Sequence, residues 1–269
     1  MVLAIKLGGS TLKEGVAPDF IEDLKETHAK EKVVLTHGGG REVTDIATKL
    51  GKEQKFVFSP EGFRSRYTDR ETAEIYTMVM SGKINKEIVA TLQSHSIPAV
   101  GVSGVDGGLI RAERKKKLVI VDERGRKRII DGGYTGKITT VNAGVLKALL
   151  ENGYMPVVAP IALGEEFEYL NIDGDRTAAY VAGAVKAKAL ILLTDVPGVY
   201  IAEKLVPKFT VKEAEATLPK IGPGMSTKIY AAMEALKMGV EKVIITSGLG
   251  KEPITSALKH KAGTVITNE

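Results

Sequence analysis

The sequence contains neither cysteine nor tryptophan in its 269 residues. Without cysteine there is no disulfide, no thiolate metal site and no thiol nucleophile, and a reducing compartment is compatible. Long apolar runs are missing too. No stretch approaches the roughly 18 to 20 apolar residues that span a bilayer, and the first residues lack the charged-then-apolar pattern of a signal peptide. We therefore expect a soluble, cytoplasmic protein.

Glycine, by contrast, is abundant and often follows apolar runs. The chain has 29 glycines and 43% hydrophobic residues, enough to bury a substantial core as one large α/β domain or two closely joined lobes. In the first run, Leu3–Ser10, a predicted strand carries Lys6 toward Gly8 and Gly9. Such a stretch is either an anion-binding loop, because glycine lets backbone N–H groups approach closely, or an ordinary strand-to-helix turn. The run Val33–Gly40 repeats the design with three glycines, which favours the anion-binding loop.

Helical periodicity follows each of these two runs, so the chain begins with the order β-α-β-α. Further strands are expected at 98–102, 156–159, 189–194, 242–246 and 264–266. This alternation predicts an α/β fold, a three-layer αβα sandwich with a mostly parallel central sheet. Ligands of such folds bind at the carboxyl ends of the strands.

Two arginines, Arg64 and Arg66, precede a predicted long helix. Thr68 and Glu71 have the spacing of a capping box that would open this helix. Guanidinium groups bind carboxylates through two parallel hydrogen bonds, and a helix N-terminus adds favourable potential. We expect a carboxylate site here, and the alternative is a pair of solvated loop arginines.

The segment 111–137 is strongly basic. It holds ten Lys or Arg against four acids, a net charge of +6, and because the whole chain carries +5 the remaining residues sum to −1. Two apolar stretches, 118–121 and 128–130, flank a polar turn and predict a β-hairpin. Such a charge run is either a solvated face or a means of attracting an acidic partner. The residues expected to dock that partner are Arg124, Arg126, Lys127 and Arg128.

Acidic and polar residues mark the second half of the chain. Asn171, Asp173 and Asp175 alternate, so an extended segment would point all three side chains the same way. For Asp175 the alternative is an N-cap of the helix predicted at 176–185. A fully apolar strand then ends in Thr194-Asp195, and Gly222-Pro-Gly-Met-Ser-Thr-Lys228 opens another helix.

Lys6 and Lys228 come from opposite ends of the chain, yet each lies beside glycines at the end of a predicted element. We predict that they converge, with Asp175 between them. Two ammonium groups and glycine N–H donors suit phosphoryl transfer, in which catalysis consists mainly of positioning and electrostatic stabilisation. The P-loop pattern and a Ser-His-Asp elbow are both missing, and the four scattered histidines form no metal cluster in the sequence.

The motifs resemble, in order, those of the amino acid kinase family over nearly the whole chain. They are Lys6-Leu-Gly-Gly-Ser10, His37-Gly-Gly-Gly40, Gly62-Phe-Arg64, Asn171-x-x-x-Asp175, Leu193-Thr-Asp-Val-Pro-Gly198 and Gly224-Met-Ser-Thr-Lys228. The chain looks closest to the N-acetylglutamate kinase branch, whose members phosphorylate a side-chain carboxylate with ATP to give an acyl phosphate.

The resemblance implies a role for each matched residue. Lys6 and Lys228 would stabilise the transferring phosphoryl group, and Asp175 would orient them. The residues implied to hold the acceptor's carboxylate end are Gly39, Gly40, Arg64 and Asn171. Those implied to lie along ATP are Gly8, Gly9, Thr194, Asp195 and Tyr200. Mg²⁺ would be held by phosphates and water, with no protein ligand. Residues 1–170 would form the acceptor lobe, with the basic hairpin 111–137, and residues 171–269 the ATP lobe.

Within this branch, the continuation Arg64-Ser-Arg-Tyr-Thr-Asp-Arg-Glu-Thr72 and the basic hairpin look like the kinases of carrier-protein lysine and arginine biosynthesis. In those pathways aminoadipate or glutamate stays joined to the C-terminal glutamate of an acidic amino-group carrier protein, LysW. The resemblance therefore implies LysW as partner. We further expect a homodimer, with no nucleic-acid or membrane partner. Asp173, where some relatives have asparagine, leaves the polar network around Asp175 open.

Other functions stay open at this point. They include N-acetylglutamate kinase, aspartokinase, which would carry a further regulatory domain, and kinases of phosphate or carbamate substrates. An RNA-binding protein would also use a basic hairpin, but Tyr134 is the only aromatic residue in 111–137 to stack on bases. A non-catalytic amino-acid sensor on this fold is expected to lose one of the two lysines, and both are present.

Overall fold

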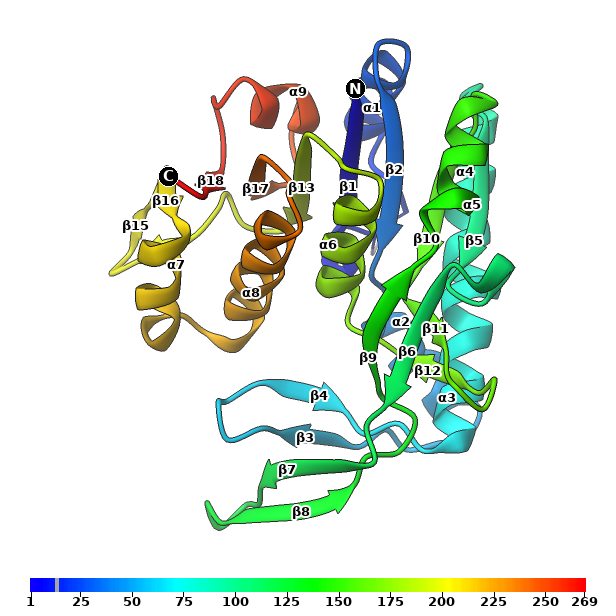
Figure 1. Cartoon of the computed structure of the whole chain (residues 1–269), viewed down its shortest axis with the longest axis vertical. Helices are drawn as coiled ribbons and strands as arrows, with labels where there is room; N and C mark the ends of the chain where they lie inside the picture. The colour runs from blue at the N-terminus through cyan, green and yellow to red at the C-terminus, as the bar shows by residue number, and fades with distance from the viewer. Residues whose placement is uncertain (13–14) are drawn as a thin grey trace.

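A computed structural model describes residues 1–12 and 15–269, with Pro223 described without its side chain. Its main sheet has eight strands, all pairs of which are parallel except β17 with β18. In spatial order they are β16 (Lys208–Thr210), β18 (Thr264–Thr267), β17 (Lys242–Ser247), β13 (Ala189–Thr194), β1 (Val2–Leu7), β2 (Lys32–His37), β10 (Met155–Ala159) and β5 (Ala99–Ser103). The predicted αβα fold with a mostly parallel sheet is confirmed (Figure 1).

Helices cover both faces of this sheet, so there is a hydrophobic core on each side of it. Successive residues of a strand point alternately into the two cores. Ala4 belongs to the core under one layer, whereas its neighbour Ile5 belongs to the core under the other. The first layer contains α5 (Ala143–Glu151), α6 (Gly174–Ala184), α7 (Val211–Thr217) and α8 (Pro223–Lys237). The second contains α1 (Pro18–His28), α2 (Gly40–Lys49), α3 (Arg70–Thr77), α4 (Asn85–Ser94) and α9 (Pro253–Leu258). Among the described residues, none of these helices has both the length and the apolar character that a bilayer crossing requires.

The long helix predicted after residue 68 forms, but two details differ. Its N-cap is Asp69, whose side chain accepts a hydrogen bond from the N–H of Thr72, so the expected capping box at Thr68 is wrong. Between α3 and α4 the chain is a π-helix, η2 (Met78–Ile84). Such wide turns often occur at functional sites, and this one packs against the glycine loop after β2.

The basic segment 111–137 does not form one hairpin. Its ends belong to a four-stranded sheet made of β12 (Tyr169–Asn171), β11 (Ile161–Leu163), β6 (Ile110–Arg114) and β9 (Gly136–Val141). Its middle joins another sheet, made of β4 (Arg64–Arg66), β3 (Phe56–Phe58), β7 (Lys117–Val121) and β8 (Lys127–Asp131). The β7–β8 hairpin therefore starts and ends inside the predicted limits, and it projects from the lower end of the molecule (Figure 1).

Short elements complete the chain. They are the two-stranded β14 (Tyr200–Ile201) and β15 (Lys204–Leu205) and the 3₁₀ turns η1 (Gly9–Leu12), η3 (Asp106–Gly108) and η4 (Leu218–Lys220). The predicted lobe boundary after residue 170 falls inside β12 (Tyr169–Asn171), just before α6. The main sheet is continuous across it, because β1 pairs with β2 on one side and with β13 on the other. The assignment of one ligand to each lobe stays a prediction.

Candidate active site

The glycine loops that follow β1 and β2 pack directly on each other. The N–H of Gly8 donates to Leu193 O at 3.0 Å, and the N–H of Gly38 donates to Leu7 O at 2.9 Å. A Cβ on Gly9 would lie 2.9 Å from the backbone nitrogen of Gly39. Only glycine permits this approach, which is why both strands end in glycine runs.

Gly39 is constrained twice. Its φ of +156° is one that other residues rarely adopt, and a Cβ there would lie 2.2 Å from Cδ1 of Ile84 in the π-helix. Within the described part of the chain, the backbone N–H groups of Gly9 and Gly39 have no hydrogen-bond acceptor. With the first turn of α2 behind them, these donors make an anion-binding position.

Lys6 and Lys228 converge on Asp175 as the sequence predicts. Lys6 Nζ lies 2.8 Å from Asp175 Oδ1, and Lys228 Nζ lies 3.1 Å from Oδ2. All three side chains are largely buried. Burial alone would raise the pKa of Asp175, but the charges and hydrogen bonds of the two lysines lower it to about 2. The carboxylate therefore stays ionised and holds two cations at fixed positions.

The alternative that Asp175 caps α6 is wrong, because the cap is Asp173. The Asp173 side chain accepts a hydrogen bond from the N–H of Arg176 at 2.9 Å, and the helix begins at Gly174. The segment is thus extended only as far as residue 173, and Asp175 lies in the first helical turn. The Asp173 side chain is exposed at the cleft, where neighbouring protein atoms displace part of its water; this loss of solvation and the negative charge of Asp175 raise the pKa of Asp173.

A cleft of about 400 Å³ opens in front of these groups. Arg64 and Asn171, the two side chains expected to hold the acceptor, both line it together with Asp173. The Arg64 guanidinium stacks 3.6 Å from the centre of the Phe56 ring. Asn171 donates from Nδ2 to Thr68 Oγ1 at 2.9 Å. The cleft thus unites the predicted acceptor residues with Lys6 and Asp175, and their roles toward a bound acceptor stay a prediction.

Arg66 has a different role from Arg64, although the sequence treats them alike. It is buried, and its guanidinium donates to Gly40 O at 2.6 Å, to Thr44 Oγ1 at 2.9 Å and to Gln54. These bonds hold the glycine loop and the start of α2 in place. Arg66 is therefore a positioning residue in this structure, and the expectation that it binds a carboxylate is not supported by its contacts.

His37 is a second positioning residue that sequence reasoning missed, although it stands in the glycine motif. It is fully buried, and burial, aided by the charges of Lys6 and Lys86, lowers its pKa to about 4. Asn85 Nδ2 donates to Val157 O, which fixes the amide, and also lies 3.2 Å from Nε2 of His37. Nε2 must then accept, so Nδ1–H donates to Gly38 O at 3.0 Å. The neutral ring ties the glycine loop to the π-helix and α4.

Lys115 is a third residue that the sequence did not single out, because it is one of many cations in its segment. It lines the cleft with Arg64 and Asp173. Burial and the charge of Arg176 lower its pKa. Arg176 itself pairs with Glu234 of α8, so it is held against the helix that carries Lys228. Lys115 adds a further cation to the acceptor side of the cleft.

Most of the residues expected along ATP lie at one edge of the main sheet, because Gly8 and Gly9 follow β1 while Thr194 and Asp195 end or follow its parallel neighbour β13. Thr194 ends β13 and is buried, and its Oγ1 donates to Asp195 Oδ1 at 3.1 Å. Gly8 packs against it, since a Cβ there would lie 2.7 Å from Leu193 O. Tyr200 is farther along the chain on β14, with an exposed side chain. Whether these residues contact a nucleotide stays a prediction.

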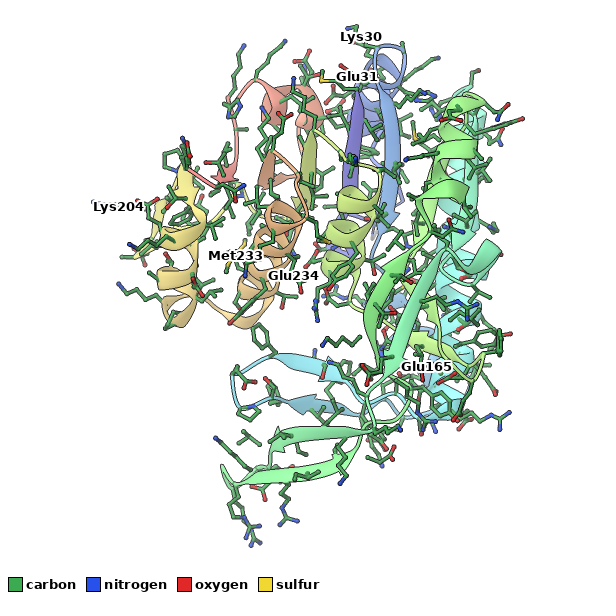
Figure 2. The ribbon with its side chains drawn as sticks, in the orientation of Figure 1. Lys30, Glu31, Glu165, Lys204, Met233 and Glu234 are labelled. Carbon is green, nitrogen blue, oxygen red and sulfur yellow. The ribbon has the colours of Figure 1, made fainter. Side chains whose placement is uncertain are left out.

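The four cations expected to dock a partner are all exposed, but they are not equivalent. Asp122 in the hairpin turn lies 3.1 Å from Arg126 and 2.8 Å from Arg128. Hydrogen bonds from the backbone and side chain of Arg126, with that from Arg128, lower the pKa of Asp122. Figure 2 shows nitrogen-tipped side chains pointing away from the hairpin tip into solvent.

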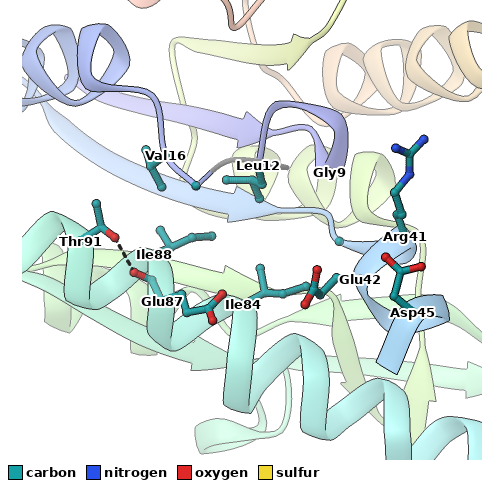
Figure 3. Close-up of a pocket in the computed structure, with 12 residues that line it drawn as sticks. Gly9, Leu12, Val16, Arg41, Glu42, Asp45, Ile84, Glu87, Ile88 and Thr91 are labelled. Carbon is teal, nitrogen blue, oxygen red and sulfur yellow. Dashed lines mark hydrogen bonds between the residues drawn. The ribbon is translucent and has the colours of Figure 1, made fainter. Parts of the chain in front are cut away.

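Behind the glycine loops lies a smaller cavity of about 160 Å³ (Figure 3). It shares Gly9 and Gly39 with the cleft region and is bordered by Glu42 of α2 and by Ile84 and Glu87 across from it. Lys83 pairs with Glu42 and Glu87, two of the three acids that line this cavity. No group of three or more His, Cys, Asp or Glu side chains able to hold a metal ion occurs in residues 1–12 and 15–269.

Known sequences resemble this chain over nearly its whole length. Residues 1–247 match the amino acid kinase family. A Saccharolobus solfataricus protein named LysW-aminoadipate/LysW-glutamate kinase is 47% identical over 268 residues, which cover 99% of this chain and 100% of that protein. A Cenarchaeum symbiosum protein given the same name provisionally is 56% identical over 265 residues, covering 98% of this chain and 99% of that protein.

Solved structures share the fold at lower identity. A Streptococcus mutans protein has a TM-score of 0.81 and 24% identity, covering 100% of this chain and 99% of that one. Carbamate kinase from Giardia lamblia bound to AMP-PNP has a TM-score of 0.65 and 20% identity, covering 99% and 98%. These likenesses support the expected carbamate kinase-like architecture.

Proposed function

The chain belongs to the amino acid kinase family, and we propose that it uses ATP to phosphorylate a carboxyl group on a carrier protein. The acceptor is the side-chain carboxylate of aminoadipate or glutamate, attached to an acidic amino-group carrier protein of the LysW type. The product is an acyl phosphate. Two relatives named LysW-aminoadipate/LysW-glutamate kinase, one of them provisionally, match the chain over 98% and 99% of its length.

The observation that carries the proposal is the pair of lysines fixed on Asp175. Phosphoryl transfer spreads negative charge over the oxygens of the moving group, and fixed cations in a dry site stabilise that charge. An acceptor carboxylate oxygen forms a bond to the γ-phosphorus while the bond from that phosphorus to the β,γ-bridging oxygen breaks, and ADP leaves with the electron pair. Lys6 and Lys228 each contact one oxygen of Asp175, and Gly9 and Gly39 line the same cleft as Lys6 and Asp175.

A carboxyl acceptor also agrees with the titratable groups beside the lysines. A carboxylate is already ionised near pH 7, so it needs no general base, whereas a hydroxyl acceptor does. Asp175 cannot serve as that base, because its pKa of about 2 reflects two bound lysines. His37 cannot serve either, because it is fully buried with both ring nitrogens engaged.

ATP use follows from membership of a kinase family, and we propose Mg²⁺ as its companion ion. When bound, Mg²⁺ would neutralise phosphate charge. The donor set suits an ion held mainly by phosphates and water, because the buried carboxylate Asp175 is occupied by Lys6 and Lys228. The protein contributes cations and backbone donors on the other sides of the phosphates.

The carrier is proposed from charge. The segment 111–137 has a net charge of +6, while the rest of the chain sums to −1. A cationic element that projects from the fold attracts an acidic macromolecule and raises its association rate. A small free metabolite gives no comparable reason for such a segment. A homodimer and a cytoplasmic location stay predictions, which sedimentation and fractionation can check.

One experiment compares acceptors side by side. The protein is mixed with ATP and an acidic carrier bearing aminoadipate, the same carrier bearing glutamate, free acetylglutamate, or free aminoadipate. Hydroxylamine traps an acyl phosphate as a hydroxamate, and ADP release is followed in parallel. We expect both products with a loaded carrier. Equal or faster turnover of acetylglutamate would instead assign the protein to the acetylglutamate kinases.

A further inference from the structure

The outer part of the β4-β3-β7-β8 sheet carries exposed apolar side chains on one face. Val119 and Ile129 are directly opposed across β7 and β8, and they are 47% and 68% exposed. Phe58 on β3 is 46% exposed and is opposed to the half-buried Val121 on β7. We call these four residues, Phe58, Val119, Val121 and Ile129, the apolar strip.

Register places the apolar strip on one face of the sheet. Residues directly opposed in a ladder project to the same side, and so do residues two apart on a strand. Val119 and Val121 therefore share a face. Ile129 lies on the same face because it is opposed to Val119, and Phe58 because it is opposed to Val121. Along β7 and β8 the opposite face holds half-buried Leu118 and Ile130, so the more exposed face is the one that carries the strip.

Two cations lie at the ends of one row of this face. Arg64 is opposed to Phe58, and Lys127 is opposed to Val121. The row thus runs from Arg64 through Phe58 and Val121 to Lys127. Arg64 lines the acceptor cleft. The apolar strip is therefore continuous with the acceptor site at one end and reaches the hairpin cations at the other.

We propose that the apolar strip is the surface on which the acidic carrier protein docks, with the tethered acceptor entering the cleft at the Arg64 end. This inference rests on the proposed function. Exposed charge attracts a partner but is screened and contributes little once contact is made. Apolar side chains at the centre of a contact, surrounded by charge, supply most of the binding energy in such interfaces.

A second copy of this chain fits the strip less well than an acidic carrier. The segment that contains β7 and β8 has a net charge of +6, so two copies meeting here would bring like charges together. An acidic partner removes that repulsion and pairs with Lys127 and the neighbouring cations. The charge complementarity and the continuity with Arg64 both select the carrier.

The test uses the double variant Val119→Thr with Ile129→Thr. Threonine keeps the β-branched shape that suits a strand and replaces a methyl-bearing arm by a hydroxyl. The matched control is Leu50→Thr, since Leu50 is 59% exposed at the far end of α2. Carrier binding is measured by titration calorimetry at low and high salt, together with thermal melting, sedimentation and ATP binding.

We expect the double variant to bind the loaded carrier about 10-fold more weakly, because apolar burial is lost. The fold-change should be the same at both salt concentrations, and ATP binding should not change. Leu50→Thr should bind the carrier like the wild type. A fold-change that vanishes at high salt would show a charge effect and overturn the proposal.

The remaining outcomes separate this inference from the proposed function. Unchanged binding in the double variant, with normal binding by the wild type, would overturn the strip and leave the carrier-dependent kinase in place. Loss of a dimer in sedimentation would assign the strip to a second copy. A wild-type protein that binds no carrier and turns over free acetylglutamate would overturn both.

Discussion

Two aspartates in this molecule each hold a pair of cations, one in the candidate active site and one on the hairpin. Asp175 lies 2.8 Å from Lys6 and 3.1 Å from Lys228. Asp122 lies 2.8 Å and 3.1 Å from two arginines whose side chains are 56% and 53% exposed. The distances are the same, but the surroundings differ. Buried charges act strongly on a reacting group, whereas exposed ones are screened by water and salt.

The difference assigns separate tasks to the two regions. The buried triad has little freedom and fixes where negative charge is stabilised, which concerns the chemical step. The exposed cluster remains open to a partner and concerns encounter. Variants in the first region should therefore change kcat, and variants in the second should change the KM of the macromolecular substrate.

The largest effect is expected in the buried triad. Lys6→Ala or Lys228→Ala should each lower kcat by about 10²-fold or more, because each removes a contact to the developing phosphoryl charge. Steady-state turnover of the loaded carrier measures this, with circular dichroism to check folding. The exposed Lys147→Ala is the control and should keep full kcat. Near-normal kcat in either variant would remove that lysine from the mechanism.

His37 should make stability depend on pH. In the unfolded chain its pKa is about 6.5, whereas in the fold it is about 4, so below pH 6.5 only the unfolded state takes up the proton. Stability due to the neutral ring is complete above pH 6.5 and is lost as the pH falls. Between pH 7 and 5 the unfolding free energy should drop by on the order of 2 kcal/mol from this group.

Urea denaturation at several pH values measures that slope. His37→Gln keeps an uncharged hydrogen-bonding side chain but cannot titrate, so its slope between pH 7 and 5 should be smaller. The variant will be less stable at pH 7, and only the slope is informative. An identical slope in both proteins would mean that other groups cause the pH dependence.

Effects of intermediate size are expected from Arg64 and Arg66, and the two variants should change different properties of the protein. Arg64→Ala should raise the KM for the acceptor by roughly 10- to 100-fold, the value of a lost charged hydrogen-bond pair, with ATP affinity nearly unchanged. Arg66→Ala should instead lower thermal stability, because it removes three hydrogen bonds that hold the glycine loop. Equal losses for acceptor and ATP in Arg64→Ala would contradict its assignment to the acceptor.

Smaller effects are expected on the hairpin. Replacing Arg124, Arg126, Lys127 and Arg128 by serine should raise the KM for the loaded carrier severalfold at low salt, because exposed charges contribute modestly. Because Arg126 and Arg128 are paired with Asp122, the pair Arg124 and Lys127 should account for more than half of it. Kinetics of the two double variants decide this, with ATP binding as the control.

The smallest effect should come from Asp173, the cleft carboxylate. If the acceptor is a carboxylate, no base is needed, so Asp173→Asn should keep kcat within about threefold. Because the pKa of Asp173 is raised, any activity lost as the pH falls through its titration should be absent in the variant. A 10²-fold loss of kcat at every pH would indicate a general base and point to a hydroxyl acceptor.

The sequence predicted those features of the fold and site that depend on a short local pattern of residues. Glycines directly after apolar runs, each near a lysine, predicted the edge of the sheet at which Lys6 and Lys228 meet. The alternation of strands and helices predicted the parallel sheet. Both inferences depend on patterns within a few residues. Lys6 is on β1 and Lys228 is in α8, and they meet at Asp175 in the first turn of α6.

The sequence did not predict the features that depend on how segments distant in the chain pack together. Arg64 and Arg66 lie two apart on β4 and share a face, so only the packing against α2 makes one structural and leaves the other exposed. The cap of α6 lies two residues before the predicted one, because Asp173 and Asp175 are equally good caps in isolation. The π-helix 78–84 has no sequence signal, and it is the packing of Ile84 on Gly39 that makes it relevant to the site.

The measurement that tests the separation of the two regions most directly is the salt dependence of wild-type kinetics. Turnover of the loaded carrier is followed from about 0.05 to 0.5 M salt, a range over which exposed charges become screened. The account predicts that KM for the carrier rises severalfold while kcat stays constant, since the buried triad is shielded from salt. A kcat that falls with salt, or a KM that does not change, would contradict it.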